Sequence, residues 1–315
     1  MRYEIDSRTS INETLKKLKD GDTLFLKQGI YNEKLDIYIN NINIIGENKE
    51  TTIITNNDYY HKIMDDNNEC NTFRTYTVLI GGNNVKIENI TIENSSTPSS
   101  KYGQAIALYV DGDNFKCNNS IIKSCQDTLF TGPLPKNLKE RYKGFLNDHQ
   151  INSPKSKQIY TNTKIIGDVD FIFGGAQVLF YNCEIMSIKR TTNPFENNGY
   201  IAAPSHDIDD KYGYLFYKCT LTSNDESTET YLARPWRDYG NSCFIDCEYK
   251  VKINPLGFNK WDGTERDKTC RFFEYNKKYN LTNRASFVKI LTDVEKNDYL
   301  NDFFKFMNLR RNDYE

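Results

Sequence analysis

Residues 119–130 read NSIIKSCQDTLF and residues 162–173 read NTKIIGDVDFIF, and the two stretches align without a gap at an offset of 43 residues. This alignment gives Asp127 and Asp170 equivalent places in two repeat units. Equivalent residues on neighbouring strands of a parallel sheet lie roughly 5 Å apart. Two carboxylates that close repel each other, so the pKa of one of them rises. The pair therefore has the arrangement that an acid and a base, or an acid and a nucleophile, require.

A shorter unit recurs along the chain, with an apolar pair, a polar residue, a small residue and an alternating apolar tail. It reads FYNCEIMS at 180–187, FYKCTLTS at 216–223 and FIDCEY at 244–249, with an earlier form, VKIENITIEN, at 85–94. Alternation and β-branched residues indicate strands, and uneven spacing is typical of a solenoid whose loops differ in length. Since no helical pattern separates these strands, the sequence predicts an all-β fold, a single-stranded right-handed parallel β-helix, over a doubly wound α/β fold.

Both ends of this solenoid carry signals for a short capping helix. Residues 10–13, SINE, form a capping-box pattern that predicts an N-terminal cap over about 8–20. Residues 292–295, TDVE, form a second one and predict a C-terminal helical segment over about 286–311. Apolar residues at helical spacing follow it and are expected to pack on the solenoid: Tyr299, Leu300, Phe303, Phe304 and Met307. We therefore expect a single domain over residues 1–315.

One long polar stretch, about residues 131–157, separates the two aspartate repeats and contains the turn-forming run GPLP at 132–135. It predicts an excursion from the solenoid. The excursion is either a decorative loop or a wall beside the site, since it leaves the solenoid next to Asp127.

Composition excludes several classes of partner. With 41 basic and 43 acidic residues, the chain lacks the basic surface that nucleic acid or an anionic membrane requires. We also expect the protein to be a monomer. No run is long and apolar enough for a membrane span. Residues 1–6 include no apolar signal segment, which predicts a cytoplasmic location, or secretion if the N-terminus was trimmed. The eight cysteines lack metal-binding spacing and are interpreted as small buried residues in a reducing compartment.

The three histidines argue against a serine esterase. None of His61, His149 and His206 accompanies a nucleophilic serine in a G-x-S-x-G turn. No calcium or zinc pattern is present either. The sequence therefore predicts neither a metal nor a cofactor.

Five motifs follow one another along the predicted solenoid. They are GIYNE at 29–33, GQAIAL at 103–108, QDTL at 126–129, DFIFG at 170–174 and LARPW at 232–236. In this order the set resembles the pectin methylesterase (pectinesterase) family, in its bacterial type. The resemblance implies a right-handed parallel β-helix. It also implies hydrolysis of the methyl esters of galacturonate units in pectin, with release of methanol.

The resemblance also implies the catalytic roles. Asp170 matches the nucleophile, and Asp127 matches the general acid that later acts as the base. Gln104 and Gln126 match the glutamines that stabilise the oxyanion, although both also suit an internal polar ladder. Arg234 matches the arginine that holds the nucleophile. Physically, this cation would keep Asp170 ionised, whereas Asp127 would take the raised pKa and hold the proton for the departing methoxide.

Aromatic residues complete the expected site. Trp236 matches an aromatic that lines the sugar groove, since a ring stacks on a sugar face at little entropic cost. Phe171 and Trp261 are further candidates for substrate binding, although a structural role suits Trp261 as well. Ala233 replaces the glycine usual in the LGRPW motif, which affects the pose of Arg234 if that glycine had a positive φ.

Two other classes of function remain open from the sequence. Another uronate-active β-helix enzyme, such as a lyase or a glycoside hydrolase, would need a different arrangement of charged groups. A non-catalytic solenoid that binds sugars would not need the intact aspartate pair. Methanol release without an unsaturated product separates the esterase from the first alternative. An Asp170→Asn change without effect would favour the second.

Overall fold

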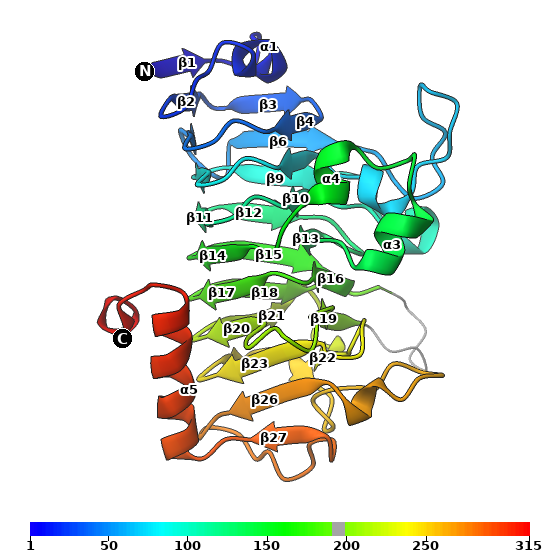
Figure 1. Cartoon of the computed structure of the whole chain (residues 1–315), viewed down its shortest axis with the longest axis vertical. Helices are drawn as coiled ribbons and strands as arrows, with labels where there is room; N and C mark the ends of the chain where they lie inside the picture. Colours follow the sequence, from blue (N-terminus) through cyan, green and yellow to red (C-terminus); the bar gives the residue numbers. More distant parts are fainter. Residues whose placement is uncertain (191–198) are drawn as a thin grey trace.

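The computed structural model of the chain describes residues 1–190 and 199–315. The fold is a parallel β-helix, in which three parallel sheets wind around one apolar core (Figure 1). Eight successive coils, from β2 to β25, each give one strand to each sheet, whereas β1, β26 and β27 belong to the first sheet alone. Strands that are neighbours in a sheet therefore come from successive coils. This architecture confirms the predicted fold class.

The first sheet contains β1 (Arg2–Ile5), β2 (Thr23–Leu26), β5 (Asn43–Gly46), β8 (Lys86–Glu88), β11 (Phe115–Asn118), β14 (Lys157–Thr161), β17 (Gln177–Tyr181), β20 (Tyr214–Tyr217), β23 (Asn241–Ile245), β26 (Arg271–Tyr275) and β27 (Val288–Ile290). The second contains β4 (Leu35–Ile37), β7 (Val78–Ile80), β10 (Leu108–Val110), β13 (Leu129–Thr131), β16 (Val169–Gly174), β19 (Tyr200–Pro204), β22 (Glu229–Ala233) and β25 (Lys252–Ile253). The third contains β3 (Gly29–Asn32), β6 (Thr52–Asn56), β9 (Thr91–Asn94), β12 (Ile121–Lys123), β15 (Lys164–Gly167), β18 (Glu184–Ser187), β21 (Thr220–Ser223) and β24 (Glu248–Tyr249).

The strand register reproduces the alignment of the two aspartate repeats. Ile122 of β12 pairs with Ile165 of β15, and Leu129 of β13 pairs with Ile172 of β16. Both pairs are 43 residues apart in the chain, which is the offset of the two stretches. All four side chains point into the core. A slip of one residue would move the apolar side chains to the outer face, so their burial fixes the register.

The turn from the first sheet to the third explains the recurring unit. Its polar residue has a left-handed backbone in the coils from β8 to β23, as in Asn119 (φ 45°) and Asn182 (φ 51°). Asparagine and aspartate are among the few residues besides glycine that adopt this region readily. Some of these amides bind one another across coils, and Asn182 donates from Nδ2 to Oδ1 of Asn162 at 2.7 Å. The small residue that follows turns inward, which is why Cys183 and Cys219 are buried.

Aromatic side chains stack along the inside of the first sheet. The centroids of Tyr160, Phe180, Phe216 and Phe244 are 5.1, 4.6 and 4.3 Å apart in turn, and the last two pairs are nearly parallel. Such pairs contribute about 0.5–1.5 kcal/mol each beyond the burial of their surface.

The N-terminal cap is α1 (Ile11–Leu15), shorter than the predicted 8–20. Ser10 accepts a hydrogen bond from the Glu13 amide as expected, but Glu13 does not complete the capping box. Instead Glu33, the last residue of the GIYNE motif, accepts from the amides of Ile11 and Asn12 at 2.7 and 3.0 Å. The anion at the helix start is therefore supplied by the next coil.

The C-terminal helix α5 (Asp293–Phe306) has the predicted capping box between Thr292 and Glu295. The helix runs along the outside of the first sheet (Figure 1). Its buried face carries Leu300, Phe303 and Phe304, as the helical spacing predicted. The predicted segment 286–311 also includes β27, so its first part is a strand and not helix.

The remaining elements are short. They are α2 (Ser99–Tyr102), α3 (Lys136–Arg141), α4 (Asp148–Asn152), and the 3-10 turns η1 (Thr72–Arg74), η2 (Arg266–Lys268) and η3 (Arg311–Tyr314). The excursion predicted at 131–157 leaves after β13 and returns at β14, and it contains α3 and α4. Among the described residues, no helix has both the length and the apolar character that a membrane span requires.

Candidate active site

A cavity of about 410 Å³ opens on the outer face of the second sheet. It brings together seven of the eight predicted site residues, namely Gln104, Gln126, Asp127, Asp170, Arg234, Trp236 and Trp261. The other lining residues are Thr72, Phe73, Leu138, Arg141, Tyr142, Phe173, Ala203 and Arg237. The cavity therefore gathers residues that are spread over most of the chain.

The two aspartates occupy matching turns on successive coils. Asp127 lies just before β13 and Asp170 lies near the start of β16, and both have a left-handed backbone, with φ of 63° and 49°. The amide of Asp127 donates to the Val169 carbonyl at 3.1 Å, which joins the two turns directly. The pairing of β16 with β19 is irregular between Val169 and Ile172, at the turn that carries Asp170. The local turn geometry thus directs both carboxylates away from the core and into the cavity.

Arg234 binds Asp170 at two points. Its Nε donates to Oδ1 at 2.9 Å and its Nη2 donates to Oδ2 at 2.6 Å. The guanidinium also lies 3.8 Å from the ring centroid of Tyr200 and 4.3 Å from that of Trp261. Two rings and a planar ion pair restrain the same group, so the carboxylate of Asp170 is held in one orientation. Trp261 therefore contacts the cation as well as lining the cavity.

Asp127 lies in a different electrostatic environment. Burial raises the pKa of this carboxyl well above its ordinary value, the negative charge of Asp170 raises it further, and Arg234 offsets only part of the increase. Arg234 makes its hydrogen bonds to Asp170 and not to Asp127. Asp170 is therefore paired with a cation, whereas Asp127 is disposed to hold a proton.

The two glutamines lie side by side at the cavity. Gln104 and Gln126 form an isolated parallel bridge, in which the Ala105 amide donates to the Gln126 carbonyl at 3.1 Å. Both side chains are partly exposed and line the cavity beside Asp127. Two neutral amide donors there suit an oxyanion.

Aromatic rings form the walls. Trp236 packs edge-on against Phe173 at 5.5 Å, and Phe73 packs against Tyr142 of the 131–157 excursion at 5.8 Å. The excursion thus supplies one wall of the cavity and is more than a decorative loop. Sequence reasoning missed Phe73, Tyr142 and Tyr200. Tyr200 is the first residue of β19, which lies beside β16 in the second sheet, and this placement is a signal that could have found it.

The prediction that Phe171 contacts substrate is wrong. Its side chain is fully buried in the apolar core, whereas Phe173 faces the cavity. The left-handed turn at Asp170 interrupts the alternation of the strand, so Phe171 and Ile172 both point inward. Only from Ile172 onward does the strand alternate between core and cavity.

Ala233 causes no backbone strain. It lies at the end of β22 with an extended backbone, and its methyl group packs in the core. The next residue, Arg234, donates its amide to the Ala202 carbonyl at 3.0 Å, so the arginine is anchored to β19. The position does not use the positive φ that would require glycine.

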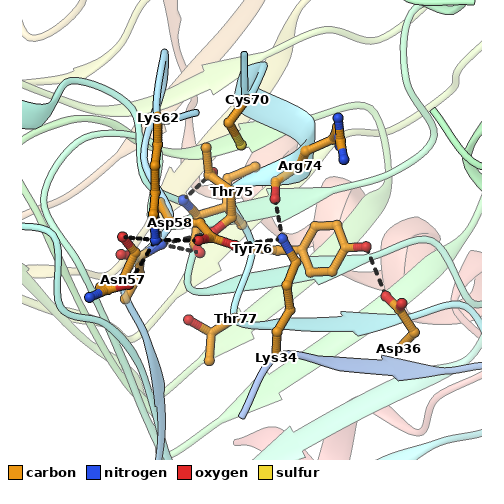
Figure 2. A network of polar contacts seen from close by, with 12 residues as sticks. Lys34, Asp36, Asn57, Asp58, Lys62, Cys70, Arg74, Thr75, Tyr76 and Thr77 are labelled. Atoms are coloured by element: carbon orange, nitrogen blue, oxygen red, sulfur yellow. Dashed lines mark hydrogen bonds and ion pairs between the residues drawn. The ribbon is translucent and has the colours of Figure 1, made fainter. Parts of the chain in front are cut away.

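A second excursion, residues 57–77, brings Thr72 and Phe73 to the cavity, and a polar network anchors it (Figure 2). Lys34 and Lys62 each donate to the buried carboxylate of Asp58 at 2.8 Å. The ammonium group of Lys34 also donates to the Arg74 carbonyl, next to Phe73. Lys34, from the solenoid, therefore binds the excursion near both of its ends, at Asp58 and at Arg74.

Lys34→Met is expected to loosen this excursion. The change leaves the buried Asp58 with one cation and removes the donor to Arg74, at a cost on the order of 2 kcal/mol. We expect a lower melting temperature and faster proteolytic cleavage within residues 57–77. Lys16→Met, which removes an exposed cation paired with Glu13 on α1, is the control and should change neither. Equal cleavage rates for both variants would contradict the anchoring role.

No three side chains among the acidic, histidine and cysteine residues of the described ranges gather as metal ligands would.

Comparison with known proteins gives one family. The family model for pectinesterase matches residues 5–140 and 142–299. A pectinesterase/pectinesterase inhibitor of Arabidopsis thaliana is 29% identical over 80% of the chain and 41% of its own length, and one of Prunus persica is 30% identical over 76% and 42%. The chain thus spans about two fifths of the length of these curated relatives.

Solved structures agree on the fold. The pectin methylesterase of carrot superposes with a TM-score of 0.76 at 22% identity, over 98% of this chain and 96% of that one. The pectin methylesterase of Yersinia enterocolitica gives 0.72 at 26% identity, over 92% and 96%. The family match extends over nearly the whole solenoid and includes the strands that carry the aspartate pair. The chain is a member of the pectinesterase family.

Proposed function

We propose that the chain hydrolyses the methyl esters of galacturonate units in pectin or its oligogalacturonides. The observation that carries this proposal is the contrast between the two aspartates of one cavity. Asp170 is clamped by Arg234, whereas burial raises the pKa of Asp127. Family membership supports the same activity, and one structural neighbour, a pectin methylesterase, was solved in complex with a hexasaccharide.

In the proposed reaction an oxygen of Asp170 attacks the carbonyl carbon of the ester. The neutral amides of Gln104 and Gln126 donate to the oxyanion of the tetrahedral intermediate. Asp127 gives its proton to the methoxide, and methanol leaves. The acyl group remains on Asp170 as a mixed anhydride.

The second half returns the enzyme to its starting state. Asp127, now ionised, takes a proton from a water molecule that attacks the anhydride carbonyl. The anhydride bond to Asp170 breaks, and the galacturonic acid leaves and gives its proton to the solvent. Asp170 recovers its charge and its ion pair with Arg234, and Asp127 again holds the proton. Trp236 and Trp261 present ring faces on which the sugar units of the substrate stack.

Methanol release from methyl-esterified oligogalacturonides of defined length, and from pectin, tests the proposal. We expect one methanol for each new carboxylate and no unsaturated or shortened oligomer. The same oligomers without methyl groups are the control and should yield no methanol. Chain cleavage without methanol would instead support a lyase or a glycoside hydrolase. Binding of the oligomers with no product of either kind would support a sugar-binding solenoid.

A further inference from the structure

Asp168 lies two residues before the proposed nucleophile and is as deeply buried as the core, with 2% of its surface exposed. The mechanism above gives this carboxylate no role. Buried acidic groups are rare unless they are hydrogen-bonded or paired with a cation. The hydrogen-bond partners of Asp168 therefore indicate its role.

The carboxylate of Asp168 is divided between two segments of the chain. One oxygen, Oδ1, accepts from the amide of Val169 at 2.7 Å and so fixes the turn that leads to Asp170. The other, Oδ2, accepts a hydrogen bond from the hydroxyl of Ser99, which is also buried. Ser99 begins α2, which ends at Tyr102, and Gln104 follows after the capping residue Gly103.

The backbone of the same residue binds the third segment of the site. The amide of Asp168 donates to the carbonyl of Cys125 at 3.0 Å, next to Gln126. One residue later, the carbonyl of Val169 accepts from the amide of Asp127 at 3.1 Å. Asp168 therefore lies where the segments that carry Gln104, Asp127 and Asp170 meet.

We propose that Asp168 is a positioning residue for ester hydrolysis, which through Ser99 ties the nucleophile turn to the segment that carries Gln104. This inference rests on the proposed function. The distance between the attacking oxygen and the oxyanion donors depends on how these two segments are held. A misplacement of about 1 Å between such groups lowers the rate by roughly 100-fold. The tie acts on catalysis and not on contacts with the rest of the substrate.

Asp168 also adds a second negative charge near Asp127. The charged groups that act on Asp127 are Asp170 and Asp168, which favour its protonated form, and Arg234, which opposes it. Burial raises the pKa of Asp168 itself, and the hydrogen bonds from Ser99 and Val169, with the charge of Arg190, offset part of that increase. Above this pKa the ionised Asp168 helps Asp127 to keep its proton.

Two variants separate the tie from the charge. Ser99→Ala removes the donor and keeps the carboxylate, so we expect kcat for methanol release to fall about tenfold or more while KM stays within twofold. Asp168→Asn removes the charge, so Asp127 loses its proton at lower pH. We therefore expect the alkaline limb of the kcat profile to move down by about half a pH unit or more. Ser99→Ala should leave that limb in place.

Ser120→Ala is the matched control, since this buried hydroxyl donates to the Asn118 carbonyl at 3.0 Å and accepts from the Ile90 amide at 3.3 Å, and neither partner lines the cavity. Its kcat should stay within twofold of wild type. A folded Ser99→Ala variant with unchanged kcat would overturn the positioning role of the Asp168–Ser99 hydrogen bond. This test does not depend on whether Asp168→Asn folds. An unmoved alkaline limb in Asp168→Asn would overturn the role of the charge. No methanol from wild type contradicts the proposed function and this inference together, whereas an active wild type with unaffected variants contradicts only the inference.

Discussion

Asp170→Asn is expected to lower kcat for methanol release by roughly 10⁴-fold or more. An amide cannot form the acyl intermediate, and it loses the two-point ion pair with Arg234. The fold should persist, because Asp170 has a left-handed backbone that asparagine adopts equally well. Methanol release at saturating oligogalacturonide, with circular dichroism and a melting curve, measures the effect.

Asp246→Asn is the matched control for this change. Asp246 also has a left-handed backbone, with φ 53°, but it lies at a turn of the solenoid whose equivalents in other coils are four asparagines and Lys218. It is expected to keep wild-type kcat. If Asp170→Asn kept activity within tenfold of the control, Asp170 would not be the nucleophile. Loss of activity in both would point to a general effect on the solenoid.

Asp111→Asn is expected to stabilise the protein at alkaline pH. Asp111 follows β10 and is 1% exposed, and neither carboxylate oxygen has a hydrogen-bond partner among the described residues. Gly132 packs directly on the carboxylate, so the group lies beneath the 131–157 excursion. Burial raises the pKa of Asp111 to about 7, an effect that Ser153, Lys139 and Tyr109 only partly offset.

The sign of the effect follows from the linkage of protonation to folding. In the unfolded chain the carboxyl loses its proton near pH 4, whereas the folded protein retains it to about pH 7. The free energy of unfolding therefore falls as pH rises through this window, by as much as about 4 kcal/mol above pH 7. Asparagine does not titrate, so Asp111→Asn does not lose this free energy of unfolding. Its gain in stability over wild type should be small at pH 4 and largest above pH 7.

Urea unfolding at a series of pH values measures this difference. Asp113→Asn, at an exposed aspartate two residues away, is the control and should retain the wild-type slope. The prediction fails if Asp111→Asn loses stability between pH 4 and 7 as steeply as wild type. Asp111 lies against the excursion that carries Arg141 and Tyr142 to the cavity. In wild type, faster proteolysis of residues 131–157 at high pH should therefore accompany the loss of stability.

The repeats alone predicted the solenoid, the register of the aspartate coils and the residue types at the turns. These features depend on neighbours in the chain. Alternating side chains select a strand, an asparagine such as Asn119 tolerates a left-handed turn, and a capping box such as that at Thr292 satisfies its own helix. The five motifs then placed Asp127, Asp170 and Arg234 in one site, because parallel coils bring equivalent positions together.

Tertiary structure decided which other side chains reach that site. Phe171 turned inward because the turn at Asp170 breaks the strand alternation, and Tyr200 met Arg234 only through the stacking of separate coils. Phe73 and Tyr142 arrive on excursions whose paths are set by long-range contacts, such as that of Lys34 with Asp58. The buried charge of Asp168 and its bond to Ser99, 69 residues earlier, are likewise non-local. The sequence by itself determined the coil and its aspartate pair, and packing between distant segments determined the walls and supports of the cavity.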